Sequence, residues 1–206
     1  MTIPKIIHQI WVGNENPKPE RLMQLWKDKH PDFVFQEWNE ETIRKDFRLN
    51  KQIEEMYKAK RWHGVADLVR YEVIYKYGGF VAPADSECLN PIDDLLDLGC
   101  FACYENEEYN KELVSPHLGC CPGDKLIGEI IAVLEKKETV LEKEPWRETG
   151  NLFLTTMIKK LDYKEITILP SYTFIPKHRT GIEYKGDGKV YARHHWGTTK
   201  KIYSQL

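Results

Sequence analysis

Two periodicities of apolar side chains alternate along this chain, one typical of β-strands and the other typical of helices. Residues 4–13 and 32–38 are short runs of apolar, β-branched and aromatic residues. They predict strands, the first of which suits the buried centre of a sheet. Residues 17–31 carry apolar side chains at helical spacing and predict a helix that connects these two strands.

Later segments continue this alternation of helices and strands. The longest predicted helix covers residues 64–77 and ends at Gly78 and Gly79, because a glycine adopts the left-handed conformation of a helix C-cap at little cost. The other predicted helices cover residues 39–47, 50–60, 125–136 and 151–160. The other predicted strands cover residues 80–85, 100–104, 118–121, 165–170, 172–176 and 189–196.

This order of elements predicts an α/β fold in which helices flank one sheet, and the sequence contains no internal repeat and no low-complexity linker. A chain of 206 residues that is 41% hydrophobic is long enough to bury a core, so residues 1–206 are interpreted as a single domain. Sheets of this class bind ligands beyond the carboxyl ends of their strands, and candidate site residues are expected there.

The near-neutral charge of the chain argues against partners that are held by its overall electrostatic field. A formal net charge of -2 gives no field that would hold nucleic acid or an anionic membrane. No window reaches the ~18 consecutive apolar residues of a membrane-spanning helix, and the first residues contain neither a basic leader nor a small-residue cleavage site. We therefore expect a soluble, cytoplasmic protein with no nucleic-acid or membrane partner.

Five cysteines are an odd number in a chain without an export signal, so reduced thiols are expected. Cys100 and Cys103 form a C-x-x-C pair, but no second pair has this spacing. Residues three apart on a strand face opposite sides. The two thiols are therefore interpreted as small buried hydrophobic side chains rather than as zinc ligands or a redox pair.

Polar side chains gather at the ends of the predicted strands. Trp11, Asp85 and Glu87 each lie at or just beyond such an end, so we expect them at one rim of the sheet. Asp67 and Arg70 are three residues apart on the longest helix and share a face that could point toward the same rim. The alternative for this pair is an ordinary intrahelical salt bridge, worth about 0.3 to 0.5 kcal/mol.

Four stretches carry a resemblance to a known family: IPKIIHQIWVG, ADLVRYEVIYKYGGFVAPADSECLNPIDDL, RETGNLFLT and ARHHWG. They resemble the glycosyltransferases whose sugar-binding region contains a DxD motif, namely glycosyltransferase family 32 and its relatives. The chain is similar in size to small virus-encoded members such as those of chlorella viruses. The resemblance implies a GT-A fold, which is a Rossmann-like mixed sheet flanked by helices.

The resemblance also implies a reaction. It is the transfer of a sugar from a nucleotide-sugar donor to a hydroxyl group of a glycan or glycoprotein acceptor. The donor implied by the family is a UDP-sugar. The implied cofactor is Mn2+ or Mg2+, and the implied outcome is retention of the anomeric configuration. A nucleotide-sugar hydrolase and a catalytically impaired nucleotide-sugar-binding module are the alternative functions.

Donor-binding roles follow from the same resemblance. Trp11 would stack on the nucleobase, while the backbone of Ile10 and Val12 would pair with its edge; the alternative is a core tryptophan. Asp67 would bind sugar hydroxyl groups, and Arg70 would lie near the sugar or the diphosphate.

Asp85 matches the second acid of the DxD motif, which is expected to bind the metal that bridges both phosphates. Counting from the double glycine, the first acid should fall at Pro83, whose side chain cannot bind a metal. Either Asp85 and Glu87 form a shifted motif, or a histidine assists Asp85, and we favour the histidine. Only one of His194 and His195 is expected to reach the metal, because neighbouring residues on a strand face opposite ways.

Glu148, Thr149 and Gly150 match the family's E-T-G-P stretch, which implies a place against the donor near the acceptor side of its sugar. Helix capping by Thr149 is the alternative. The expected catalytic residues are Asp85, through the metal, and Arg70, because both stabilise the charge that grows on the departing diphosphate. The sequence identifies no carboxylate that could act as nucleophile or base.

Overall fold

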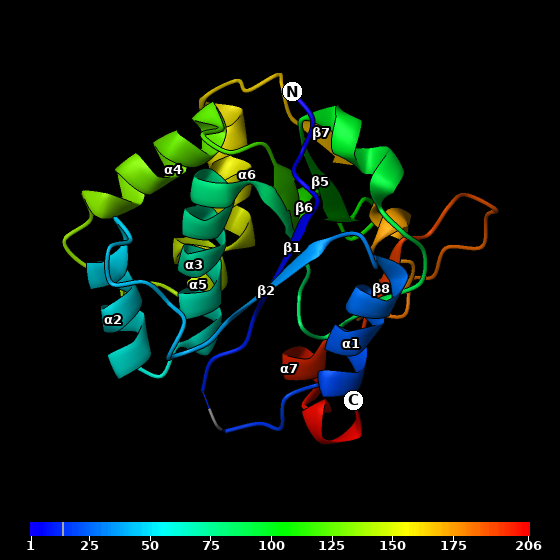
Figure 1. The fold of residues 1–206 in the computed structure, drawn as a ribbon, viewed down its shortest axis with the longest axis horizontal. Coiled ribbons are helices and arrows are strands. Elements are labelled where there is room, and N and C mark those ends of the chain that lie inside the picture. The colour runs from blue at the N-terminus through cyan, green and yellow to red at the C-terminus, as the bar shows by residue number, and fades with distance from the viewer. Residues whose placement is uncertain (14) are drawn as a thin grey trace.

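The computed structural model describes residues 1–13 and 15–206, with only the backbone at residues 110 and 111. Its centre is a six-stranded mixed sheet (Figure 1). In spatial order the strands are β2 (Val34–Trp38), β1 (Ile6–Ile10), β3 (Gly79–Val81), β6 (Asn110–Cys120), β5 (Cys100–Asn106) and β7 (Thr167–Leu169). β1 is parallel to both neighbours, β6 is antiparallel to β3 and β5, and β7 is parallel to β5. A separate antiparallel pair joins β4 (Ser86–Cys88) to β8 (Ala192–His194).

Helices cover both faces of the sheet, which gives three layers and confirms the predicted α/β class (Figure 1). One core contains side chains of α2 (Asn50–Lys58), α3 (Trp62–Tyr77), α4 (Lys125–Glu135) and α6 (Asn151–Lys160). The core on the other face contains side chains of α1 (Glu20–Lys29) and the 3-10 helix Asp93–Leu98. The remaining short helices are α5 (Pro145–Glu148), α7 (Gly197–Lys200) and the 3-10 helices Ser171–Thr173 and Tyr203–Gln205. Within the described ranges, none of the helices combines the length and apolar character needed to cross a membrane.

The junction of α3 and β3 depends on Gly78 and Gly79, whose φ angles are 65° and 98°. A Cβ on Gly79 would lie 2.6 Å from the carbonyl oxygen of Ile6 in the neighbouring strand, and a Cβ on Gly78 would lie 2.6 Å from Cδ of Pro122. These positions therefore require both a left-handed backbone and the absence of a side chain. The predicted end of the helix at this double glycine is confirmed.

The buried side chain of His8 ties β1 to its surroundings. Its Nδ1 accepts a hydrogen bond from Nε1 of Trp38 at 3.1 Å, so its Nε2 carries the hydrogen that is donated to the carbonyl of Gly78 at 2.8 Å. Burial outweighs this carbonyl contact and lowers the pKa of His8 from 6.5 to about 4. The folded protein therefore holds this imidazole in its neutral form.

Two predicted elements are wrong. Residues 39–47 form turns rather than a helix, because Oδ1 of Asn39 accepts hydrogen bonds from the backbone N–H groups of Glu41 and Thr42 and so competes with helical pairing. Residues 172–176 do not form a strand, because the chain turns after Pro170 into a 3-10 helix. The predicted strand at 80–85 is also shorter than expected and ends at Val81.

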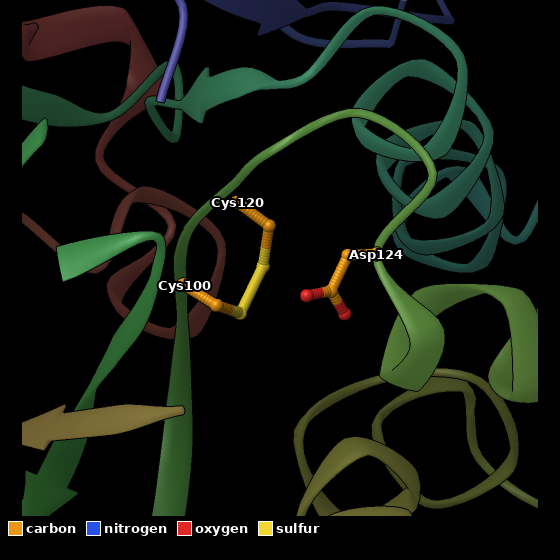
Figure 2. Close-up of side chains that lie close together, drawn as sticks. All are labelled: Cys100, Cys120 and Asp124. Atoms are coloured by element: carbon orange, nitrogen blue, oxygen red, sulfur yellow. A yellow bond between two sulfur atoms is a disulfide. The ribbon is translucent and has the colours of Figure 1, made fainter. Parts of the chain in front are cut away.

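A disulfide bond joins Cys100 to Cys120, so the expectation of reduced thiols is wrong for these two residues (Figure 2). They lie directly opposite each other in the antiparallel pairing of β5 and β6, with their Cα atoms 4.0 Å apart. Cys88, Cys103 and Cys121 are free and buried. Cys100 and Cys103 belong to different hydrophobic cores, which confirms that they face opposite sides of the sheet.

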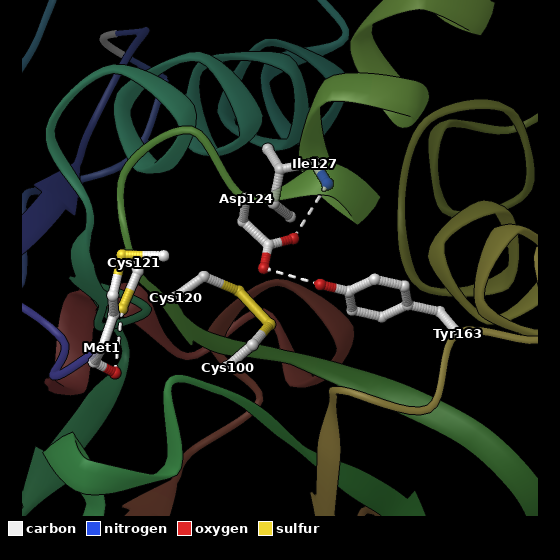
Figure 3. The surroundings of a disulfide bond; sticks show 7 residues. All are labelled: Met1, Cys100, Cys120, Cys121, Asp124, Ile127 and Tyr163. Atoms are coloured by element: carbon white, nitrogen blue, oxygen red, sulfur yellow. Dashed lines mark hydrogen bonds between the residues drawn. A yellow bond between two sulfur atoms is a disulfide. The ribbon is translucent and has the colours of Figure 1, made fainter.

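Asp124 lies beside this disulfide, close enough for the three side chains to resemble a metal site (Figure 3). One oxygen of Asp124 accepts from the backbone N–H of Ile127 at 3.3 Å, and the other accepts from the hydroxyl of Tyr163 at 2.9 Å. The two sulfur atoms are bonded to each other. Asp124 therefore caps α4 and anchors Tyr163, and the oxidised cluster does not hold a metal.

His8 should make the free energy of unfolding depend on pH. Its pKa is about 4 in the folded state and 6.5 as a free side chain, so the unfolded chain binds the proton more readily. The stability that neutral His8 contributes is full above pH 6.5 and is lost as the pH falls toward 4, by about 3 kcal/mol in total. Urea unfolding across this range should show a shallower decline for His8→Gln than for the wild type.

The comparison needs a control because burial also lowers the pKa of His30 and His117. The decline in the free energy of unfolding of the wild type includes contributions from these two histidines. Only the difference between the wild type and His8→Gln measures the contribution of His8. His63→Gln, which replaces an exposed imidazole, is the matched control. Parallel declines for the wild type and His8→Gln would contradict this assignment.

Candidate active site

A cavity of about 680 Å³ lies beyond the carboxyl ends of β1 and β3. Ile10 ends β1 and lines the cavity, and so do Val81, which ends β3, and residues 82–85, which follow it. α3 contributes Asp67 and Arg70, and the segment after β8 contributes Trp196. The cavity therefore occupies the rim at which ligands of open α/β sheets bind.

Asp67 and Arg70 form a buried ion pair in the wall of this cavity. Nη2 of Arg70 donates to Oδ1 of Asp67 at 2.6 Å, and the side chains are only 7% and 9% exposed for Arg70 and Asp67. Burial raises the pKa of Asp67, and the guanidinium opposes this shift. Within the described chain, Nε and Nη1 of Arg70 are buried without a hydrogen-bond partner. The pair is thus an intrahelical salt bridge that leaves two N–H groups of the guanidinium without a hydrogen-bond partner among the described residues.

The helix-start segment before α6 supports Asp67 from behind. Oγ1 of Thr149 donates to Oδ2 of Asp67 at 3.4 Å, and the hydroxyl of Tyr71 donates to the carbonyl of Thr149 at 2.7 Å. A Cβ on Gly150 would lie 2.6 Å from Oδ2 of Asp67. Glu148 is buried and pairs with Lys137. None of Glu148, Thr149 and Gly150 is among the described residues that line the cavity, whereas Asn151, the next residue along, lines it.

Asp85 binds the C-terminal segment through both its backbone and its side chain. Its Oδ2 accepts from the backbone N–H of Gly197 at 2.7 Å, and its carbonyl accepts from the N–H of His195 at 2.9 Å. Its Oδ1 lies 3.4 Å from Nδ1 of His194, a buried atom with no hydrogen-bond partner among the described residues. Asp85 and His194 both line the cavity. The structure therefore brings these two metal-ligand candidates together.

The side chains of Glu87 and His195 pair with each other and not with Asp85. Nε2 of His195 lies 3.0 Å from Oε2 of Glu87, and Nη1 of Arg193 lies 3.6 Å from the same oxygen. Neither Glu87 nor His195 is among the described residues that line the cavity. Pro83, by contrast, lines it. The structure thus separates the two metal-ligand candidates Glu87 and His195 from Asp85 and His194.

Trp11 and Val12 line a second pocket of about 340 Å³ that adjoins the cavity. The ring of Trp11 meets the ring of Tyr203 edge to face, with centroids 5.1 Å apart. Thr198 and Tyr203 line both pockets and so mark where they join. Burial and the charge of Asp85 raise the pKa of Tyr203, which keeps its hydroxyl neutral.

The wall of the cavity also contains residues that the sequence analysis did not select: Glu105, Tyr109 and Arg179. Glu105 lies near the end of β5, so it carries the same signal that singled out Asp85, a carboxylate where a strand stops. Arg179 lies in a region without a regular element, and no sequence pattern marks it.

Residues 18–102 match the family model described as a glycosyltransferase sugar-binding region containing a DXD motif. This region contains Asp67, Arg70 and Asp85, whereas Trp11 and His194 lie outside it. The resemblance to DxD-type glycosyltransferases is confirmed over this part of the chain.

Curated relatives match a similar share of the chain. Inositol phosphoceramide mannosyltransferase 3 of Schizosaccharomyces pombe is 37% identical over 103 residues, which are 46% of this chain and 27% of that protein. An uncharacterized glycosyltransferase of Acanthamoeba polyphaga mimivirus is 31% identical over 105 residues, which are 48% of this chain and 42% of that protein. The chain thus spans less than half of the length of these relatives.

Solved structures show the fold over a larger part of the chain. The PaToxG glycosyltransferase superposes with a TM-score of 0.60 at 14% identity, covering 78% of this chain and 69% of that chain. A glycosyltransferase involved in the glycosylation of the major capsid of PBCV-1 superposes with a TM-score of 0.57 at 9% identity, covering 97% of both chains. The fold is therefore that of the GT-A glycosyltransferases, as the sequence resemblance implied.

Gly150→Ala should destabilise the protein, because its Cβ would lie 2.6 Å from Oδ2 of Asp67 and 2.9 Å from Cα of Trp146. We expect a loss of about 1 to 3 kcal/mol in the free energy of unfolding, which chemical denaturation measures. Gly128→Ala is the control, since this glycine lies inside α4 and its Cβ would meet only the ring of Tyr75 at 3.0 Å. Equal stability of Gly150→Ala and the wild type would show that Asp67 is not held against this backbone.

Proposed function

We propose that this chain is a glycosyltransferase that moves a sugar from a nucleoside diphosphate donor, first of all a UDP-sugar, to a hydroxyl group. One observation carries the proposal: Arg70, Asp85 and His194 line a single cavity, and Nε and Nη1 of Arg70 have no hydrogen-bond partner among the described residues. A buried guanidinium with unpaired donors is unfavourable by itself and is stabilised by an anion such as a diphosphate. The family match over residues 18–102 supports the same reading.

The residues of the cavity suit a divalent metal such as Mn2+ or Mg2+. Nδ1 of His194 is buried without a hydrogen-bond partner in the described structure and lies 3.4 Å from Oδ1 of Asp85. A carboxylate oxygen and an imidazole nitrogen are both ligands that Mn2+ accepts, and diphosphate oxygens would complete its shell. When bound, the metal would neutralise charge on the departing diphosphate. Asp85 and His194 would hold it.

The chain's own side chains would organise the donor along the two pockets. The base would lie in the smaller pocket against Trp11 and Tyr203, and the diphosphate would lie at the guanidinium of Arg70. The remaining lone pairs of Asp67 would accept hydrogen bonds from sugar hydroxyl groups. Arg70 would then stabilise the charge that grows on the leaving diphosphate, which makes the catalysis chiefly electrostatic.

The transferred sugar is proposed to be a hexose. Two of the matched curated proteins are named mannosyltransferases, so mannose belongs in the first donor panel beside glucose and galactose, each on UDP and on GDP. The outcome at the anomeric carbon is proposed to be retention, as the resemblance to the DxD-type glycosyltransferases implies.

Donor turnover measured with and without an acceptor mixture tests the proposed function. Nucleoside diphosphate release that rises when acceptors are added, with formation of a new glycoside, is the expected result. Release at the same rate with and without acceptors would instead identify a hydrolase. Metal-dependent binding without any release would identify a binding module, a role that Pro83 at the first DxD position makes worth testing.

Asp85→Asn and His194→Gln should remove the metal dependence of UDP binding. Calorimetry of the wild type is expected to show affinity at least about tenfold higher in Mn2+ than in EDTA, equivalent to ~1.4 kcal/mol. Each variant should bring this ratio to about one while leaving the EDTA affinity unchanged. Glu87→Gln is the matched control, because Glu87 pairs with His195 outside the cavity. If Glu87→Gln abolished the metal effect and Asp85→Asn did not, the metal would belong to the shifted motif.

The fluorescence of Trp11 should change when the nucleobase of UDP binds. UDP is expected to quench tryptophan fluorescence, and Trp11→Phe should remove most of the quench while preserving an aromatic surface for binding. Trp11→Ala should weaken UDP binding by roughly fivefold or more, since stacking of a base on an aromatic ring is worth about 1 to 3 kcal/mol. A full quench in Trp11→Phe would place the base next to another of the six tryptophans.

A further inference from the structure

Glu105 is a buried carboxylate that faces the same cavity and is not used by the proposed binding of the donor. It lies near the end of β5, is 8% exposed, and lines the cavity wall. Nδ2 of Asn151 donates to its Oε2 at 3.3 Å, and Nε2 of His178 lies 3.3 Å from its Oε1. Two residues that are distant from Glu105 in the sequence therefore hold this carboxylate in place.

The hydrogen bonds of His178 show which way the proton lies. Nδ1 of His178 lies 2.7 Å from the hydroxyl oxygen of Thr180 and accepts from the backbone N–H of Thr180 at 3.4 Å. We assign the hydrogen to Nε2, which then donates to Glu105. The imidazole is itself buried, and its ring packs against Trp196 with centroids 5.1 Å apart. Each oxygen of Glu105 thus receives one N–H group and keeps a lone pair for a ligand.

The position of Glu105 in the cavity separates it from the part proposed for the base. Thr198 and Tyr203 line both pockets and mark their junction, whereas Glu105, Tyr109 and Arg179 line only the larger cavity. Asn151, which holds Glu105, directly follows Gly150, which packs on Asp67. The sugar end of a donor bound at Asp67 would therefore be bordered by the wall that contains Glu105.

We propose that Glu105 forms the acceptor subsite, where it accepts a hydrogen bond from the hydroxyl group that receives the sugar. This inference rests on the proposed function. An ionised carboxylate only accepts hydrogen bonds, so the subsite takes a neutral polyhydroxy compound, a sugar or a polyol, and disfavours a carboxylate or phosphate at the reacting position. His178 and Asn151 are positioning residues that keep the carboxylate aimed into the cavity.

The test compares Glu105→Gln and Glu105→Asp with the wild type. The first variant removes the charge, and the second keeps it but withdraws the carboxylate by one methylene group. Glu107→Gln is the matched control, because Glu107 lies on the same hairpin and binds the backbone N–H and hydroxyl of Ser171 rather than lining the cavity. Thermal unfolding of all four proteins checks that each is folded.

The probes are methyl mannoside, methyl glucoside, methyl galactoside and myo-inositol, added with a UDP-sugar and Mn2+. We expect Glu105→Gln and Glu105→Asp to lower kcat/KM for the best acceptor by roughly tenfold or more, mainly through KM. UDP affinity and the release of UDP without acceptor should stay within about twofold of the wild type. Glu107→Gln should behave as the wild type in every measurement.

Two outcomes would overturn the inference alone. Unchanged transfer in both Glu105 variants would show that the acceptor binds elsewhere, and an equal loss of acceptor-free UDP release would show that Glu105 acts on the donor. Failure of the proposed function has a different signature, since the wild type would then bind no UDP by calorimetry. Saturation-transfer NMR of the four probes with UDP-loaded protein gives a second readout, in which the signal of a bound probe should disappear in Glu105→Gln and persist in Glu107→Gln.

Discussion

The reversal of the chain at Gly78 and Gly79 is the constraint on which the candidate site depends. Asp67 precedes this turn by eleven residues of helix, which rise about 16 Å. Asp85 follows it by six residues, of which the first two belong to β3 and the last two lie in a turn. Both carboxylates line the same cavity, so the reversal brings α3 and the segment after β3 to one site. Only a residue without a Cβ allows this turn, because any side chain at Gly79 would meet the backbone of β1.

The sequence predicted those features that local pattern determines. The helix before the double glycine, the central first strand and the carboxylate after β3 all follow from periodicity and from the rule that α/β sheets bind ligands at their carboxyl rim. The error at residues 39–47 is also local. Asn39 has a side-chain oxygen that binds the backbone two and three residues ahead, and this pairing replaces the predicted helical turn.

The remaining features join residues that are distant in sequence, and no short-range pattern reports on them. Gly197 is 112 residues from the carboxylate that it binds at Asp85, and His178 is 73 residues from Glu105. The choice of His194 over His195 depends on the pairing of β4 with β8, which sets Ser86 opposite His194. The disulfide likewise depends on the register of β5 against β6. Such pairings are properties of the folded topology, so the sequence did not show that Glu105 and Arg179 line one cavity.

The division of the cavity wall between two parts of the chain has a consequence for how such a protein can change. Asp67, Arg70 and Asp85 come from residues 18–102, while Glu105 and Arg179 come from the part of the chain that follows. The two walls are thus encoded separately, although they face one cavity. Substitutions after residue 102 can reshape the second wall without touching the helix and strand that place the first. One scaffold can in this way keep α3 and β3 in place while the second wall of its cavity changes.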